Sequence, residues 1–133
     1  MKNIYLLTIA VIFTTASCKS NPKYSEYDES DFYEVQGVIT SAVQNDNSFD
    51  NSIVKNISYS YFLDRENPKK GIEKNLEIFE AKKGYPLIVL VHKDNEDISF
   101  YGRVGILDSI NENERAFLRK HINHEIKKLN LRK

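Results

Sequence analysis

Cysteine is nearly absent from this 133-residue chain: it occurs once, at Cys18, and tryptophan does not occur at all. One cysteine cannot form an internal disulfide, which excludes the class of small secreted domains stabilised by disulfide bonds. The sequence also contains no G-x-S-x-G nucleophile motif, no phosphate-binding loop and no G-x-G-x-x-G dinucleotide motif. The common catalytic and nucleotide-binding motifs therefore give no indication of function.

A net charge is also lacking, because 19 basic and 19 acidic residues cancel. Their distribution is uneven: residues 19–66 carry 4 basic and 9 acidic side chains, whereas residues 111–133 carry 7 basic and 3 acidic ones. A basic tail of this kind can contact an anionic membrane surface or an acidic partner. It is also typical of the solvated face of a helix.

The residues that are present indicate one globular domain. Hydrophobic residues make up 41% of the chain and charged residues 29%, which is an ordinary globular composition. After removal of an N-terminal signal, about 115 residues remain, enough for one modest core. The 8 tyrosines and 7 phenylalanines favour strands.

The first 17 residues have the layout of a secretory signal peptide. Lys2 provides a short positive region, residues 4–13 are apolar, and residues 14–17 are small. Residues 4–16 reach about 20 Å as a helix, whereas a membrane span needs about 30 Å. We therefore expect residues 1–17 to be a cleaved signal rather than a membrane-spanning helix.

The sequence TASC, ending at Cys18, resembles the lipobox of bacterial lipoproteins, although Thr15 stands where leucine is usual. The resemblance implies that the Cys18 sulfur takes a diacylglyceryl group, that cleavage precedes it, and that its new amino terminus is acylated, for example with palmitate. Two or three acyl chains give stable membrane anchorage. Residues 18–31 are then a flexible tether. Since no aspartate follows Cys18, the resemblance also implies an outer-membrane lipoprotein facing the periplasm.

Residues 32–133 are expected to form an α+β domain, a small antiparallel sheet or partial barrel of about five strands followed by one amphipathic helix. Period-two alternation is clearest in residues 53–63, and residues 85–93 form a continuous apolar run typical of a central strand. A short polar link joins that run to residues 98–107, which favours antiparallel pairing. Residues 32–43 complete the set, with Gly37 indicating a bulge or bend.

Residues 72–83 are ambiguous. Ile72, Leu76 and Phe79 have helical spacing, with Gly84 as a possible residue just beyond the helix. Ile72, Leu76 and Ile78 would instead share one face of a strand. Residue patterning alone leaves both structures open.

The C-terminal helix is predicted at residues 111–130. Ser109 with Glu112, and Asn111 with Glu114, each fit a capping box. An apolar stripe at helical spacing is expected to pack on the sheet. The stripe consists of Phe117, Leu118, Ile122, Ile126 and Leu129.

The segments VQGVI, ISYSYFL and KKGYPLIVLVHKDNEDISF resemble small bacterial DUF3592-like β-domains over residues 32–100. Glu96 and His92 depart from the proline and tyrosine common in that pattern. The resemblance implies a small antiparallel sheet or partial barrel and favours a strand at residues 72–80. It implies no active-site residues.

Candidate chemistry is sparse. His121 and His124 share a helix face, but HINHE lacks the metalloprotease spacing and nothing in the sequence brings His92 near them, so we expect no metal site. Tyr59 and Tyr61 alternate in their strand, which suits either core packing or ligand stacking. We expect no catalytic residues and no cofactor.

The leading hypothesis is a non-enzymatic, lipid-anchored envelope protein that binds or supports an envelope partner, with an exposed edge strand available for strand addition. The alternative is a small-molecule-binding lipoprotein with an apolar pocket lined by Tyr59, Tyr61 and Phe100. An enzyme would need a histidine beside a carboxylate in a cleft. An envelope location argues against a nucleic-acid partner.

Overall fold

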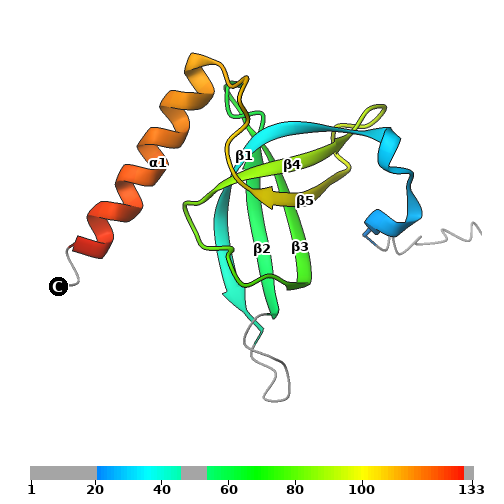
Figure 1. The fold of residues 1–133 in the computed structure, drawn as a ribbon, viewed down its shortest axis with the longest axis horizontal. Coiled ribbons are helices and arrows are strands. Elements are labelled where there is room, and N and C mark those ends of the chain that lie inside the picture. The colour runs from blue at the N-terminus through cyan, green and yellow to red at the C-terminus, as the bar shows by residue number, and fades with distance from the viewer. Residues whose placement is uncertain (1–20, 46–53, 131–133) are drawn as a thin grey trace, which may run out of the picture.

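The computed structural model describes residues 21–45 and 54–130. Two 3-10 turns, η1 and η2, precede five strands and one helix (Figure 1). The elements are η1 Tyr24–Glu26, η2 Glu29–Asp31, β1 Phe32–Gln44, β2 Val54–Tyr61, β3 Lys69–Glu77, β4 Pro86–His92, β5 Ser99–Val104 and α1 Glu112–Asn130. The predicted α+β fold of five antiparallel strands and a C-terminal helix is confirmed.

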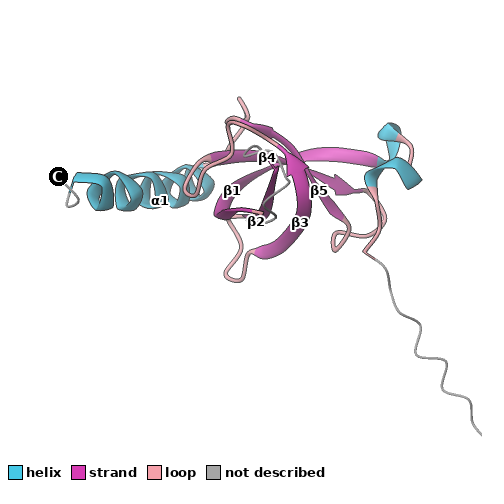
Figure 2. Cartoon of the chain, turned by 90° about the horizontal axis from the view of Figure 1, so that it is seen from below, coloured by secondary structure: helices cyan, strands magenta, loops and turns pink. Residues whose placement is uncertain are grey.

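The strands form one sheet in the order β3-β2-β1-β4-β5, and every neighbouring pair is antiparallel. Strands β1, β2 and β3 follow one another, and β4 returns to pair with β1, which is a Greek-key arrangement. The long strand β1 serves both halves of the sheet, since Gly37 pairs with Tyr61 of β2 and with Leu87 of β4. The sheet curls into a half-barrel, so its edges β3 and β5 approach each other (Figure 2).

Alternate residues of the strands point to the concave side of the sheet, and their apolar side chains fill it. The buried residues of this core come from β1, β2, β4 and the segment before β4: Ile39, Ile57, Tyr59, Tyr61, Ala81, Leu87, Val89 and Val91. Burial of each large apolar side chain contributes about 1.5–3 kcal/mol. Residues 85–93 were predicted to be the central strand, but β4 lies between β1 and β5 and the middle strand is β1. The apolar run in β4 reflects burial on both faces, with Ile88 on the opposite face only 3% exposed.

Of the two roles predicted for Gly37, a bulge or a bend, the bulge is wrong, since the register shift lies between Ile39 and Ser41. Glycine is required at position 37 because an added Cβ would lie 2.7 Å from both Ser60 O and Val89 Cγ2. Gly71 has a similar role in β3. It pairs with Tyr59, and an added Cβ would lie 2.3 Å from Cε2 of the tyrosine ring.

The ambiguous segment is a strand through Glu77, and the helical alternative for residues 72–83 is wrong. A register shift interrupts the pairing of β3 with β2, and Asn75 there has φ 58°. Asparagine tolerates this left-handed conformation, and the Asn56 side chain accepts a hydrogen bond from the Asn75 N–H at 3.1 Å. The irregularity moves Leu76 toward the core while Ile72 stays 60% exposed, which explains the mixed periodicity.

Helix α1 begins with the capping box formed by Asn111 and Glu114. The Asn111 N–H donates to the Glu114 side chain and the Glu114 N–H donates to the Asn111 side chain, each at 2.9 Å. Leu118 is buried against Val38 and Leu63 on the convex side of the sheet, and Phe117 packs beside it. The first half of the predicted apolar stripe therefore packs as expected, while the side chains of Ile126 and Leu129 lie outside the described residues.

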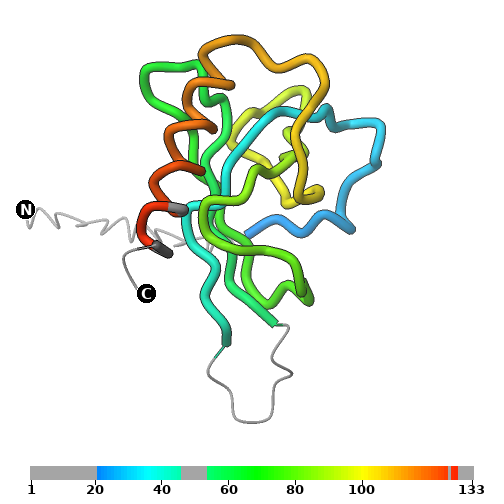
Figure 3. Tube along the Cα trace, turned by 60° about the vertical axis from the view of Figure 1, so that its left-hand side comes forward, coloured from blue at the N-terminus to red at the C-terminus, as the bar shows by residue number. Residues whose placement is uncertain are grey.

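The segment before β1 is not a flexible tether throughout. Tyr24 and Tyr27 pack against Phe32 and Phe100, with ring centroids 5.3–6.1 Å apart, and Tyr27 also contacts His92. The tether predicted at residues 18–31 therefore extends at most to Lys23. This segment and α1 lie at opposite ends of the domain (Figure 3).

The predicted signal peptide, residues 1–17, and Cys18 lie outside the described residues. Among the residues that are described, no helix combines the length and apolar character needed to cross a membrane.

Candidate functional site

The candidate site is a groove along the seam between the two edge strands, β3 and β5. These strands run in the same direction and are joined by side chains rather than by a hydrogen-bond ladder. Lys69 forms an ion pair with Asp97, and the Glu73 carboxylate accepts a hydrogen bond from the Tyr101 N–H. The groove has a volume of about 560 Å³ and is lined by residues 21–24, 70–74 and 97–100.

Tyr59 lies beneath this seam. Its ring packs under Gly71, and its hydroxyl is 3.2 Å from the Ser99 hydroxyl, which borders the groove. Burial raises the pKa of Tyr59, and the hydrogen bond to Ser99 only partly opposes this effect. Tyr59 therefore stays protonated at neutral pH and cannot act as a base toward Ser99.

Glu73 is a half-buried carboxylate in the wall of the groove. Burial raises its pKa, because the charged form loses hydration, while the hydrogen bond from Tyr101 lowers it. Because it already accepts this backbone hydrogen bond, Glu73 serves to hold the two edges of the half-barrel together.

The rim of the groove carries unpaired positive charge. Lys70 and Lys74 are exposed on β3, with Ile72 between them on the same face, and Lys23 is exposed on the N-terminal side. None of these three lysines has an ion-pair partner within residues 21–45 and 54–130. Since Asp97 is paired with Lys69, the groove presents an electropositive rim.

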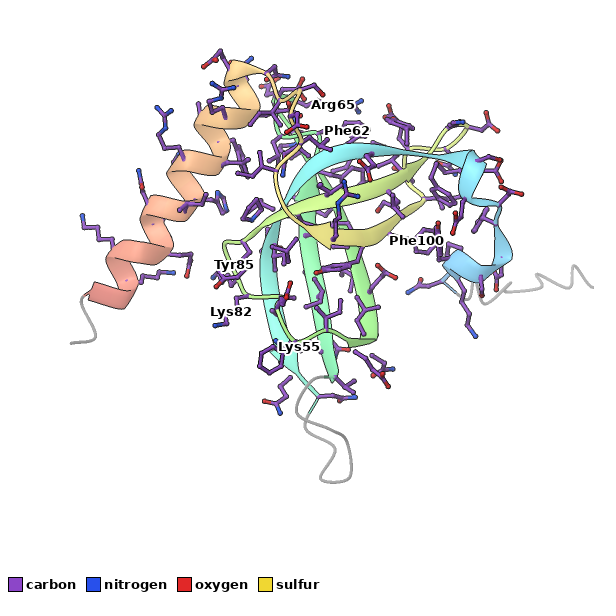
Figure 4. All side chains as sticks on the ribbon, viewed as in Figure 1. Lys55, Phe62, Arg65, Lys82, Tyr85 and Phe100 are labelled. Atoms are coloured by element: carbon purple, nitrogen blue, oxygen red, sulfur yellow. The ribbon has the colours of Figure 1, made fainter. Side chains whose placement is uncertain are left out.

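The predicted ligand-binding face of Tyr59, Tyr61 and Phe100 does not form. Tyr59 is 0% and Tyr61 is 1% exposed, and the Tyr61 hydroxyl donates to the carbonyl oxygen of Glu96 at 2.7 Å. Both tyrosines fill the concave core, whereas alternation in β5 directs Phe100 to the other face, toward η1 and η2 (Figure 4). Of the three, only Phe100 lines the groove.

Two of the three histidines, His92 and His121, make aromatic contacts. His92 lies against Tyr27 and Phe32, and its Nδ1 accepts the backbone N–H of Asp94 at 3.1 Å. His121 stacks on Phe117 at 4.9 Å, and burial lowers its pKa. In the part of the chain that is described, no group of three histidine, cysteine, aspartate or glutamate residues could hold a metal ion.

A second, smaller groove of about 230 Å³ lies beside α1. Ile106, Ile110, Leu118 and Ile122 make it largely apolar, and Arg115 and Arg119 border it. Its lining residues lie where the chain leaves β5 and enters α1, and α1 lies at the opposite end of the domain from η1 (Figure 1).

The seam groove was missed in the sequence because it depends on how far the sheet curls. The alternation of Lys70, Ile72 and Lys74 was a usable signal of an edge strand. The tyrosines at 24 and 27 were a second signal, since aromatic residues are uncommon in a solvated tether.

The resemblances to bacterial lipoproteins and to DUF3592-like domains stay predictions based on the motifs quoted. The chain matches no family model, no curated protein and no solved structure.

Proposed function

We propose that this chain is a lipid-anchored protein of the bacterial cell envelope, held by acyl chains on Cys18 at the periplasmic face of the outer membrane. Its domain acts as a non-catalytic binding module. The apolar run before Cys18 and the lipobox-like TASC support the anchor. The binding site that we propose is the seam groove.

The observation that carries this function is the division of polar groups in the groove. Glu73, Tyr59 and Asp97 are each engaged by another residue of the domain. Among the described residues, Lys23, Lys70 and Lys74 at the rim have no ion-pair partner. Engaged groups hold the fold, and free groups are available to a ligand. The expected ligand therefore carries negative charge and is bound at the surface rather than converted.

Strand addition at β3 is a less favoured mode of binding. An incoming strand would have to enter the seam and break the Glu73–Tyr101 hydrogen bond. Lysines along an edge strand also oppose pairing with other strands. The small-molecule alternative loses its basis, because Tyr59 and Tyr61 have no exposed surface to offer.

The anchor is tested by metabolic labelling with an alkyne fatty acid. We expect the wild-type protein to carry the label and fractionate with membranes, and Cys18→Ala to lose both properties. Ser20→Ala, two residues away, is the matched control and keeps the label. Undiminished labelling of Cys18→Ala would refute the lipid anchor.

A further inference from the structure

We propose that the seam groove faces the membrane and binds the headgroups of anionic phospholipids. This inference rests on the proposed function for the position of the anchor. Asn21 lines the groove and follows Cys18 by three residues, which span at most about 10 Å even when fully extended. A lipid on Cys18 would therefore hold the groove close to the bilayer surface.

The rim has the chemistry of a membrane-facing surface. Lys70, Ile72 and Lys74 alternate along β3, so two ammonium groups flank an isoleucine that is 60% exposed. Ammonium groups attract lipid phosphates, and an exposed aliphatic side chain between them can enter the interfacial region. Lys23 adds a third positive charge from the N-terminal wall.

The acidic groups near the groove do not cancel this attraction. Asp97 is paired with Lys69, and Glu73 points into the seam to meet the Tyr101 N–H. Glu26 is turned back to accept the backbone N–H of Lys23 at 3.3 Å. A hydrogen bond from a backbone N–H does not remove the charge of a carboxylate, so Glu26 and Glu73 offset part of the attraction, but Lys23, Lys70 and Lys74 outnumber them next to the proposed anchor.

The orientation that follows places α1 on the far side of the domain. In all three views the η1–η2 segment and α1 lie at opposite ends of the domain (Figures 1, 2 and 3). The basic residues of α1, such as Lys127 and Lys128, would then point away from the membrane. They provide a control of equal charge.

The test is co-sedimentation of the mature chain, residues 18–133 with Cys18→Ser, with lipid vesicles. This chain contains every described element but no acyl group, so its result is independent of the labelling experiment. We expect binding to phosphatidylcholine vesicles containing about one-third phosphatidylglycerol, and no binding to phosphatidylcholine alone. Lys70→Ala/Lys74→Ala should weaken binding about 25-fold, at roughly fivefold for each lysine.

Lys127→Ala/Lys128→Ala should change vesicle binding less than twofold. Unfolding curves of both double variants are the check that each is folded. Equal loss in the two double variants would overturn the proposal, because it would indicate non-specific attraction or contact through α1. Absence of binding to anionic vesicles would also overturn it. So would full displacement by low-millimolar inorganic phosphate, which would indicate a site for a free anion.

The lysines have an alternative role in keeping edge strands apart. That role alone predicts that Lys70→Ala/Lys74→Ala self-associates in gel filtration while vesicle binding per monomer is unchanged, and this result would refute the proposal. Ile72→Ser adds a second readout, since it leaves the charge intact. We expect it to weaken vesicle binding severalfold without changing the dependence on salt concentration.

Discussion

The carboxylate of Glu73 accepts a hydrogen bond from the backbone N–H of Tyr101, and this contact joins the two edges of a sheet that does not close. An unpaired N–H on an edge strand is a site for unwanted pairing with another chain. Glu73 occupies that N–H while leaving space for a groove on the outer side of the seam. The same side chain thus supports the half-barrel and shapes the candidate site.

Glu73 should make stability depend on pH. Burial raises its pKa, so between the ordinary and the raised pKa the folded protein holds a proton that the unfolded chain has lost. Its contribution to stability is therefore fully present below the ordinary pKa and is lost as pH rises through the raised one. Glu73→Gln keeps an oxygen acceptor for Tyr101 without the charge. We expect this variant to be more stable than wild type at neutral pH, with the difference vanishing in acid.

Urea unfolding at a series of pH values measures this difference. Glu77→Gln, at an exposed residue of the same strand, is the matched control and should change the free energy of unfolding by less than about 0.5 kcal/mol. A gain in Glu73→Gln that stays constant from acid to neutral pH would contradict the prediction, because it would then arise from packing.

Gln36 should be essential for the link between the sheet and the segment leading to α1. It is 1% exposed, its Oε1 accepts the Leu107 N–H at 2.8 Å, and its Nε2 lies 3.2 Å from the carbonyl oxygens of Leu87 and Gly105. We expect Gln36→Leu to lower the free energy of unfolding by about 3 kcal/mol, since buried partners lose their hydrogen bonds.

The control for Gln36→Leu is Gln44→Leu, at the exposed end of the same strand. It should change the free energy of unfolding by less than about 0.5 kcal/mol. Similar values for the two variants in urea unfolding would show that the hydrogen bonds of Gln36 carry little net energy.

The strands and the helix could be predicted from the sequence because their signals are local. Alternation places Ile57, Tyr59 and Tyr61 on one face whatever the rest of the chain does, and the Asn111–Glu114 capping box is complete within one turn. Residues 72–83 were ambiguous because one left-handed residue, Asn75, interrupts the strand period.

The candidate site could not be predicted because its parts meet only in three dimensions. Glu73 and Tyr101 come together because the sheet curls, and the Tyr24 ring contacts Phe100, which is far from it in the sequence. The same limit explains the predicted Tyr59, Tyr61 and Phe100 face. Strand alternation showed that the two tyrosines lie on one face of the sheet. It did not show that Phe100 in β5 lies on the opposite face.

The hydroxyls of the two core tyrosines should differ in energetic value. The Tyr61 hydroxyl donates to Glu96 O at 2.7 Å, whereas the Tyr59 hydroxyl lies 3.2 Å from Ser99 Oγ at the edge of the groove. Phenylalanine keeps each ring and removes only the hydroxyl. We expect Tyr61→Phe to cost about 1.5 kcal/mol and Tyr59→Phe about 0.5 kcal/mol in urea unfolding. The cost of Tyr59→Phe is smaller because Ser99 can bond to water once its partner is removed. A larger cost for Tyr59→Phe than for Tyr61→Phe would contradict this assignment.

The N-terminal segment should be held to the domain by Tyr24 and Tyr27. Their rings contact Phe32 and Phe100, and aromatic pairs contribute about 0.5–1.5 kcal/mol each beyond burial. Glu26 and Glu29 lie in the two 3-10 turns, so a glutamate-specific protease reports how often the segment detaches. We expect Tyr24→Ala/Tyr27→Ala to be cut there about tenfold faster than wild type, while the domain core stays intact in the mass spectrum.

Tyr85→Ala is the control for this experiment, because Tyr85 is also partly exposed, at 39%, but lies before β4 (Figure 4). It should leave the cleavage rate at Glu26 and Glu29 unchanged. Rapid cleavage of the wild-type protein, equal to that of the double variant, would restore the original prediction of a tether through Asp31. It would also remove the N-terminal wall of the seam groove, since Tyr24 would then no longer be held beside Phe100.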